Sequence, residues 1–213
     1  MSQNRLVMYG YMLASPPVTS EQPPGLVRSY AGVSRHEQWP VIAEMFWKRD
    51  PRLPAEIAEW YRAEVDAPDT ALGLLRLPTT RSLRHVQSAL RFLAEQAPIE
   101  VEVLGIELET DMTLPTCDET RVEWLGLEPY ARGEWGLLSE LSRAPELAAR
   151  WADRLNQHGL FDSRPDCLSF YEDYVGLMGT LEGPEPIAPN LPVDLLRVGR
   201  VVTADAAWAS PLG

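Results

Sequence analysis

Alternating hydrophobic and polar positions predict a strand over residues 99–111. Ile99, Val101 and Val103 alternate with glutamates, and the alternation resumes with the opposite phase after Leu104-Gly105. A one-residue slip at a glycine is typical of a β-bulge, which restores the facing of the pattern. On this interpretation one exposed face of the strand carries five acids: Glu100, Glu102, Glu107, Glu109 and Asp111.

Three further segments have strand patterns. The segment 120–128 follows a loop containing Pro115, so we expect it to form an antiparallel hairpin with the 99–111 strand and to point Arg121 and Glu123 outward. Short apolar runs predict an early strand over 6–13 and a final strand over 195–203.

The clearest helix pattern covers residues 81–97. One apolar stripe recurs at spacings of three and four residues and contains Leu83, Val86, Leu90 and Leu93. Thr80 is a candidate N-cap, and Pro98 ends the helix.

Other helical segments fill much of the remaining chain. We expect helices over 37–49, 54–65 and 134–143, one from Pro145 to Gly159, and one that begins in a capping-box-like Ser163-Arg164-Pro165-Asp166 and ends at Gly179. The sequence therefore predicts an α+β fold with a mostly antiparallel, possibly mixed, sheet of four to six strands and five or six helices.

The chain of 213 residues is long enough to bury a large core in one domain. We expect a single globular domain over 1–213, with proline-rich connectors near 14–35 and 183–193. An aromatic group in 124–174 is expected to lie mostly in the core, whereas Tyr130 and Trp135 flank a turn and are candidates for exposure.

The charge is unevenly distributed. Residues 1–98 are nearly neutral, but residues 99–130 contain nine carboxylates and one arginine, and the whole chain has a formal net charge of −12. Such a surface attracts basic groups and repels phosphate backbones, so we expect no nucleic-acid partner.

Motifs that carry chemistry are missing. The sequence contains no G-x-S-x-G or H-E-x-x-H motif and no glycine-rich phosphate loop. Cys117 and Cys167 lack C-x-x-C spacing, and the three histidines are scattered. We therefore expect no catalytic residues, metal or cofactor, and the absence of a long apolar run predicts a cytoplasmic protein without a membrane partner.

The leading hypothesis is a non-enzymatic protein that binds a basic or amphipathic protein partner through an acidic surface, as inhibitor and immunity proteins do. The expected contact residues are Glu100, Glu102, Glu107, Glu109, Asp111, Glu123, Tyr130 and Trp135. One alternative is a small hydrolase or transferase that joins Glu107, Glu109 or Asp111 to Glu172 or Asp173. A second alternative is an assembly or structural subunit. The sequence leaves open the identity of the partner, any substrate or reaction, the oligomeric state, and whether the acidic face of the strand is functional or only solvated.

Overall fold

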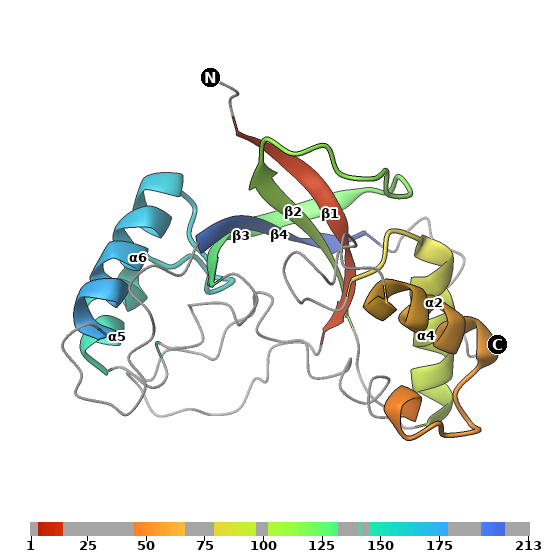
Figure 1. Cartoon of the computed structure of the whole chain (residues 1–213). Coiled ribbons are helices and arrows are strands. Elements are labelled where there is room, and N and C mark those ends of the chain that lie inside the picture. Colours follow the sequence, from red (N-terminus) through yellow and green to blue (C-terminus); the bar gives the residue numbers. More distant parts are fainter. Residues whose placement is uncertain are drawn as a thin grey trace.

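The computed structural model describes residues 4–14, 45–66, 79–96, 102–131, 141, 145–178 and 193–202. They form an α+β fold around one antiparallel sheet (Figure 1). The four strands are β1 (Arg5–Ala14), β2 (Glu102–Thr110), β3 (Val122–Ala131) and β4 (Val193–Val201). Their order in the sheet is β1-β2-β4-β3, so β2 and β4 are the central strands.

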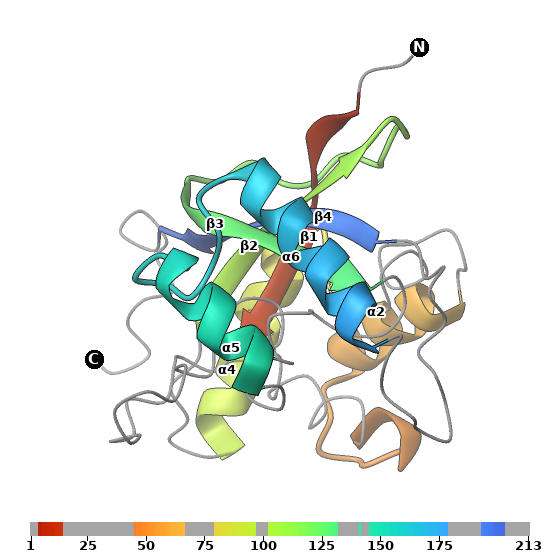
Figure 2. The same cartoon turned by 90° about the vertical axis from the view of Figure 1, so that its left-hand side faces the viewer.

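Two helix groups flank the two edges of the sheet. On the β1 side lie α2 (Ala55–Asp66) and α4 (Leu83–Gln96), and α4 contacts β1. On the β3 side lie α5 (Pro145–Trp151), the 3-10 helix η3 (Ala152–Arg154) and α6 (Arg164–Met178), and α6 contacts β3. Figures 1 and 2 show the two groups on opposite sides of the sheet.

The predicted hairpin between the second and third strands is wrong. Each of these strands pairs with β4, which lies between them, so β2 and β3 run parallel to one another. The residues between them, 111–121, must return to the opposite end of the sheet, and an extended segment of this length reaches about 35 Å. The hydrophobic pattern located both strands correctly, but it contains no information on which strand each of them pairs with.

The predicted bulge at Leu104-Gly105 is also wrong. Pairing of β2 with β4 is regular from Leu104 to Leu108. The register shifts fall instead on β1, between Met8 and Gly10, and on β3, between Trp124 and Gly126. Gly105 allows close packing, because a Cβ there would lie 3.1 Å from the Val122 side chain.

The buried hydrophobic residues form one cluster that includes side chains from the sheet and from both helix groups. On the β3 side, Trp151, Phe161 and Phe170 pack with ring centroids 5.5–5.8 Å apart. Such edge-on and tilted contacts between aromatic rings are favourable beyond the area that they bury. The prediction of a mostly buried aromatic group is confirmed for Trp151, Phe170 and Tyr174.

The stripe predicted for α4 is confirmed in part. Val86 and Leu93 are buried, whereas Leu83 and Leu90 are partly buried. The stripe is displaced toward Ala89 and Phe92, both of which are buried. The capping-box-like start of α6 is also present, since Ser163 Oγ donates to Asp166 Oδ2 at 2.6 Å and accepts from the Asp166 backbone N–H at 3.2 Å.

Several predicted segments lie mainly or wholly outside the described residues: both proline-rich connectors, the helix over 134–143 and most of the helix over 37–49. No helix within the described ranges has the length and hydrophobicity that a membrane crossing requires.

Candidate protein-binding surface

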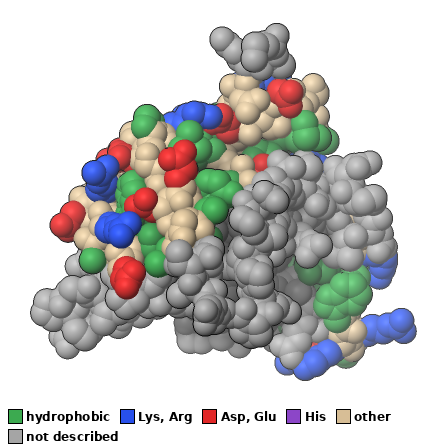
Figure 3. Space-filling model, turned by 60° about the vertical axis from the view of Figure 1, so that its left-hand side comes forward, with side chains coloured by type: hydrophobic (Ala, Val, Ile, Leu, Met, Phe, Trp, Pro, Cys, Tyr) green, Lys and Arg blue, Asp and Glu red, His purple; other side chains and the backbone are tan. Residues whose placement is uncertain are grey.

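Three of the predicted acidic contact residues are engaged inside the fold. Each forms an ion pair with an arginine of the same chain: Glu102 with Arg200, Glu107 with Arg197, and Glu109 with Arg164. Their acidic charge is therefore compensated locally. Figure 3 shows acidic and basic side chains intermixed on the side of α5 and α6.

The expectation that five acids share one exposed face is wrong. Because β2 is regular, Glu107 and Glu109 share the face of Gly105, whereas Glu102 points to the opposite face with Leu104 and Ile106. The side chains of Glu107 and Glu109 are only 14% and 13% exposed. β2 is a central strand that is covered on both faces, which is why simple alternation misassigned its outer side.

The Glu107–Arg197 pair is also packed against an aromatic ring. Arg197 Nε donates to Glu107 Oε2 at 2.6 Å, and the Arg197 guanidinium carbon lies 4.1 Å from the Trp124 ring centroid. This combination of ion pair and cation–π contact holds the side chains in place on the sheet.

The other predicted contact residues fall into three groups. Asp111 and Glu123 are exposed. Tyr130 is 1% exposed and belongs to the core, so its expected exposure is wrong. Glu100 and Trp135 lie outside the described residues.

A different exposed surface is formed by residues 111–121, the segment that joins β2 to β3. We call this segment the connector; it is distinct from the two proline-rich connectors predicted from the sequence. Most of its side chains are exposed, including Asp111, Glu119 and Arg121. Met112 is 48% exposed, one of two large hydrophobic side chains in the described residues with this property. The connector therefore combines an apolar side chain with carboxylates on one exposed segment.

Asp118 fixes the connector to the body of the molecule. Its backbone N–H donates to the Arg81 carbonyl at 2.9 Å, and its carboxylate accepts from the Leu83 backbone N–H at 2.8 Å. Its own carbonyl accepts the Tyr11 hydroxyl. A carboxylate at a helix N-terminus is favourable, so Asp118 caps α4 from a distant position in the chain. The candidate cap, Thr80, instead pairs with Tyr11 of β1.

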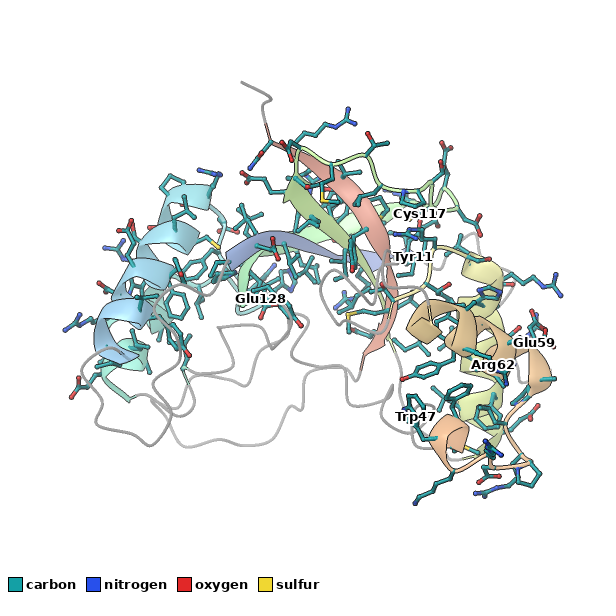
Figure 4. All side chains as sticks on the ribbon, viewed as in Figure 1. Tyr11, Trp47, Glu59, Arg62, Cys117 and Glu128 are labelled. Atoms are coloured by element: carbon teal, nitrogen blue, oxygen red, sulfur yellow. The ribbon has the colours of Figure 1, made fainter. Side chains whose placement is uncertain are left out.

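Polar side chains surround Asp118, and their hydrogen bonds join β1 to the start of α4. Burial, followed by the nearby Cys117, raises the pKa of Tyr11 to about 12, so the hydroxyl remains a donor at neutral pH. Thr80 Oγ1 lies 3.3 Å from His85 Nδ1, and burial lowers the pKa of His85. Figure 4 shows Tyr11 and Cys117 side by side next to the β1 edge.

Two of the carboxylates weighed for an enzyme are engaged by other side chains of the same chain. Asp173 accepts from Trp151 Nε1 at 2.9 Å and lies 3.6 Å from Arg150, while Glu109 is held by Arg164. In the described part of the chain, no three His, Cys, Asp or Glu side chains converge as a metal site would require. Cys167 is buried as expected, and burial raises its thiol pKa.

The sequence signals for this surface were incomplete. Met112 and Asp118 both lie in the acidic segment, but nothing in a linear pattern shows that one is exposed and the other is a distant helix cap. Comparison with protein-family models, with curated proteins and with solved structures gives no match for this chain.

Proposed function

We propose that this chain is a non-enzymatic protein that binds a basic or amphipathic protein partner, of the inhibitor or immunity type, through the connector. The observation that carries the proposal is an exposed apolar side chain, Met112, in an acidic segment that Asp118 anchors at both its backbone and its side chain.

Anchoring favours binding because a segment held in place loses little conformational freedom when a partner docks. Exposed carboxylates accelerate encounter with a basic partner, and an apolar side chain supplies a contact that excludes water. The connector offers both properties. The nearly neutral region 1–98 does not carry a comparable excess of acid.

The proposed contact set differs from the one expected from the sequence. It keeps Asp111 and Glu123, which follows the connector at the start of β3, and adds Met112 and Glu119. It leaves out the three paired glutamates of β2, the buried Tyr130, and Glu100 and Trp135, which lie outside the described residues. The paired glutamates would have to give up their arginines before they could bind a partner.

The test reverses three exposed acids of the contact set to lysine: Asp111, Glu119 and Glu123. Proteins captured from a source lysate are identified, purified and then measured for their association rate with the wild type and the variant. We expect the variant to associate about tenfold or more slowly, because electrostatic steering is lost. The wild-type rate should fall between about 0.15 M and about 1 M salt, where the Debye length drops from about 8 Å to about 3 Å.

A matched control reverses three exposed acids elsewhere, Glu95, Asp153 and Glu172, and so changes the net charge equally. This control should keep most of the wild-type association rate. Equal losses in the two triple variants would mean that only overall charge matters, and they would remove the connector from the proposal. Association that is insensitive to salt would do the same.

A further inference from the structure

A hollow of about 520 Å³ lies at the far end of the molecule from α5 and α6, next to the start of α2. Its volume is in the range of small-molecule sites. Met45 and Leu53 are buried beneath it, and Phe46, Trp47, Arg49 and Arg62 line it. Figure 3 shows basic and hydrophobic side chains together at this end of the molecule, and Figure 4 shows Trp47 and Arg62 on the same end.

The wall of this aromatic hollow is made of packed rings. Phe46 contacts Trp47 edge-on, with ring centroids 5.2 Å apart, and Tyr61 at 4.9 Å. Trp47 is nevertheless 65% exposed. Part of the Trp47 side chain is therefore accessible to a ligand in the hollow.

Two arginines supply positive charge to the hollow. The Arg62 guanidinium carbon lies 5.8 Å from the Phe46 ring centroid, and Arg49 is exposed on the adjoining turn. Within the described residues, no carboxylate forms an ion pair with either side chain. Both are therefore available to a ligand.

The one acid of the lining is already engaged. Asp50 accepts from Arg52 Nε at 3.0 Å and from Arg52 Nη2 at 2.6 Å. These hydrogen bonds lower the pKa of Asp50 to about 2, so its carboxylate stays ionised and bound to Arg52. The charge of Asp50 thus does not neutralise Arg49 or Arg62.

The backbone at Arg49, which lines the hollow, has a conformation that is uncommon for a residue with a side chain. Arg49 has φ of 53° and occupies the position of a helix C-terminal turn where glycine is usual. Two hydrogen bonds define this turn, from Arg49 N–H to the Phe46 carbonyl at 3.0 Å and from Asp50 N–H to the Met45 carbonyl at 2.9 Å. An arginine in a left-handed conformation is strained, and such strain is concentrated at functional sites.

We propose that the aromatic hollow binds a small aromatic carboxylate. The rings of Phe46 and Trp47 match a flat apolar body, and guanidinium groups bind carboxylates through paired hydrogen bonds. A single negative charge suits this chain better than a polyphosphate or a nucleic acid, because the net charge of −12 repels polyanions. This site is separate from the connector, so it does not depend on the proposed protein partner.

The test measures binding of three probes by calorimetry: naphthoate, its neutral counterpart naphthalenemethanol, and acetate. Naphthoate should bind, naphthalenemethanol should bind about tenfold more weakly, and acetate should show no binding, because both the ring and the charge contribute. Equal affinity for naphthoate and naphthalenemethanol would overturn the proposal, and so would no detectable naphthoate binding.

Substitutions of the lining residues test whether they form the binding site. Arg49→Gly should raise the thermal midpoint, because it relieves the left-handed strain, and should weaken naphthoate binding about tenfold through the lost charge. Arg62→Met should weaken naphthoate alone, and Trp47→Ala, at an exposed position, should weaken both aromatic probes. The matched control Arg91→Met, at an exposed position of α4, should leave all affinities unchanged. Wild-type affinity in Arg49→Gly and Arg62→Met would refute the site.

Discussion

Gly126 shows how one residue sets the path of an edge strand. It lies at the register shift of β3 and has φ of 156°. A Cβ built there would lie 2.6 Å from Leu160 Cβ and 2.9 Å from the Phe161 carbonyl oxygen. The loop before α6 can therefore approach β3 only because position 126 has no side chain, and Leu127 then exchanges two backbone hydrogen bonds with Phe161.

A pair of matched substitutions tests this reading. Gly126→Ala should destabilise the protein by more than about 2 kcal/mol, since it combines a strained φ with two steric conflicts. Gly176→Ala, on the exposed side of α6 with nothing within 4 Å, should stabilise by about 0.5–1 kcal/mol. Urea denaturation of both variants gives the two values. Equal effects would show that the close contact at position 126 relaxes easily.

At the scale of elements, α4 depends on a residue that is far away in the sequence. The first N–H groups of a helix need acceptors, and the Leu83 N–H finds one in the Asp118 carboxylate at 2.8 Å. Asp118 also holds the connector in place. Loss of this cap should therefore loosen both the first turn of α4 and the connector.

Asp118→Ala should reduce the free energy of unfolding by about 0.5–2 kcal/mol, the usual effect of losing an N-cap. Glu119→Ala is the control, because Glu119 is exposed and neighbours Asp118 in the chain. It should change stability by less than about 0.5 kcal/mol. Hydrogen exchange of the first turn of α4 should accelerate in Asp118→Ala alone; unchanged exchange there would contradict the capping role.

The positions of the strands along the chain were predicted better than their pairing and the faces of their side chains. Hydrophobic spacing located strands near 6–13, 99–111, 120–128 and 195–203, and each overlaps a strand of the sheet. Spacing is a local property, so it gave neither the partner of β3 nor the face of each glutamate. The ion pair between Glu107 and Arg197 joins residues 90 positions apart, and no local pattern encodes it.

The candidate sites depend even more strongly on contacts between residues that are far apart in the sequence. The acidic composition of 99–130 correctly drew attention to the segment that contains the connector. It could not distinguish Glu109, which is bound by Arg164, from the exposed Asp111 two residues later. The hollow at Trp47 was missed, because its lining joins residues 45–53 to Ala58 and Arg62 of α2, and spacing along the chain does not show that these two segments meet.

At the scale of the whole molecule, β4 connects the two sides of the fold. It pairs with β2, which leads to β1 and α4, and with β3, which leads to α6. Val198 lies in the middle of this strand, 1% exposed, opposite Ile106 on one side and Gly126 on the other.

Val198→Pro should therefore abolish cooperative unfolding of the whole chain, because proline in a central strand removes a ladder hydrogen bond and is found almost only in edge strands or at bulges. Val198→Ala removes only side-chain packing and should lower stability by about 2 kcal/mol while keeping one transition. Hydrogen exchange at α4 and α6 is the measurement. Loss of protection in both helices would support the expected single domain, whereas protection that survives in one of them would indicate two units.

The position of β4 also affects how the chain matures during synthesis. A ribosome produces β1, β2 and β3 well before β4, at about 5–20 residues per second. During that interval β2 has one unpaired edge and β3 has no strand beside it, and open edges of this kind pair readily with strands of other chains. We therefore expect the nascent protein to need protection by chaperones until residues 193–201 leave the exit tunnel, however stable the finished sheet becomes.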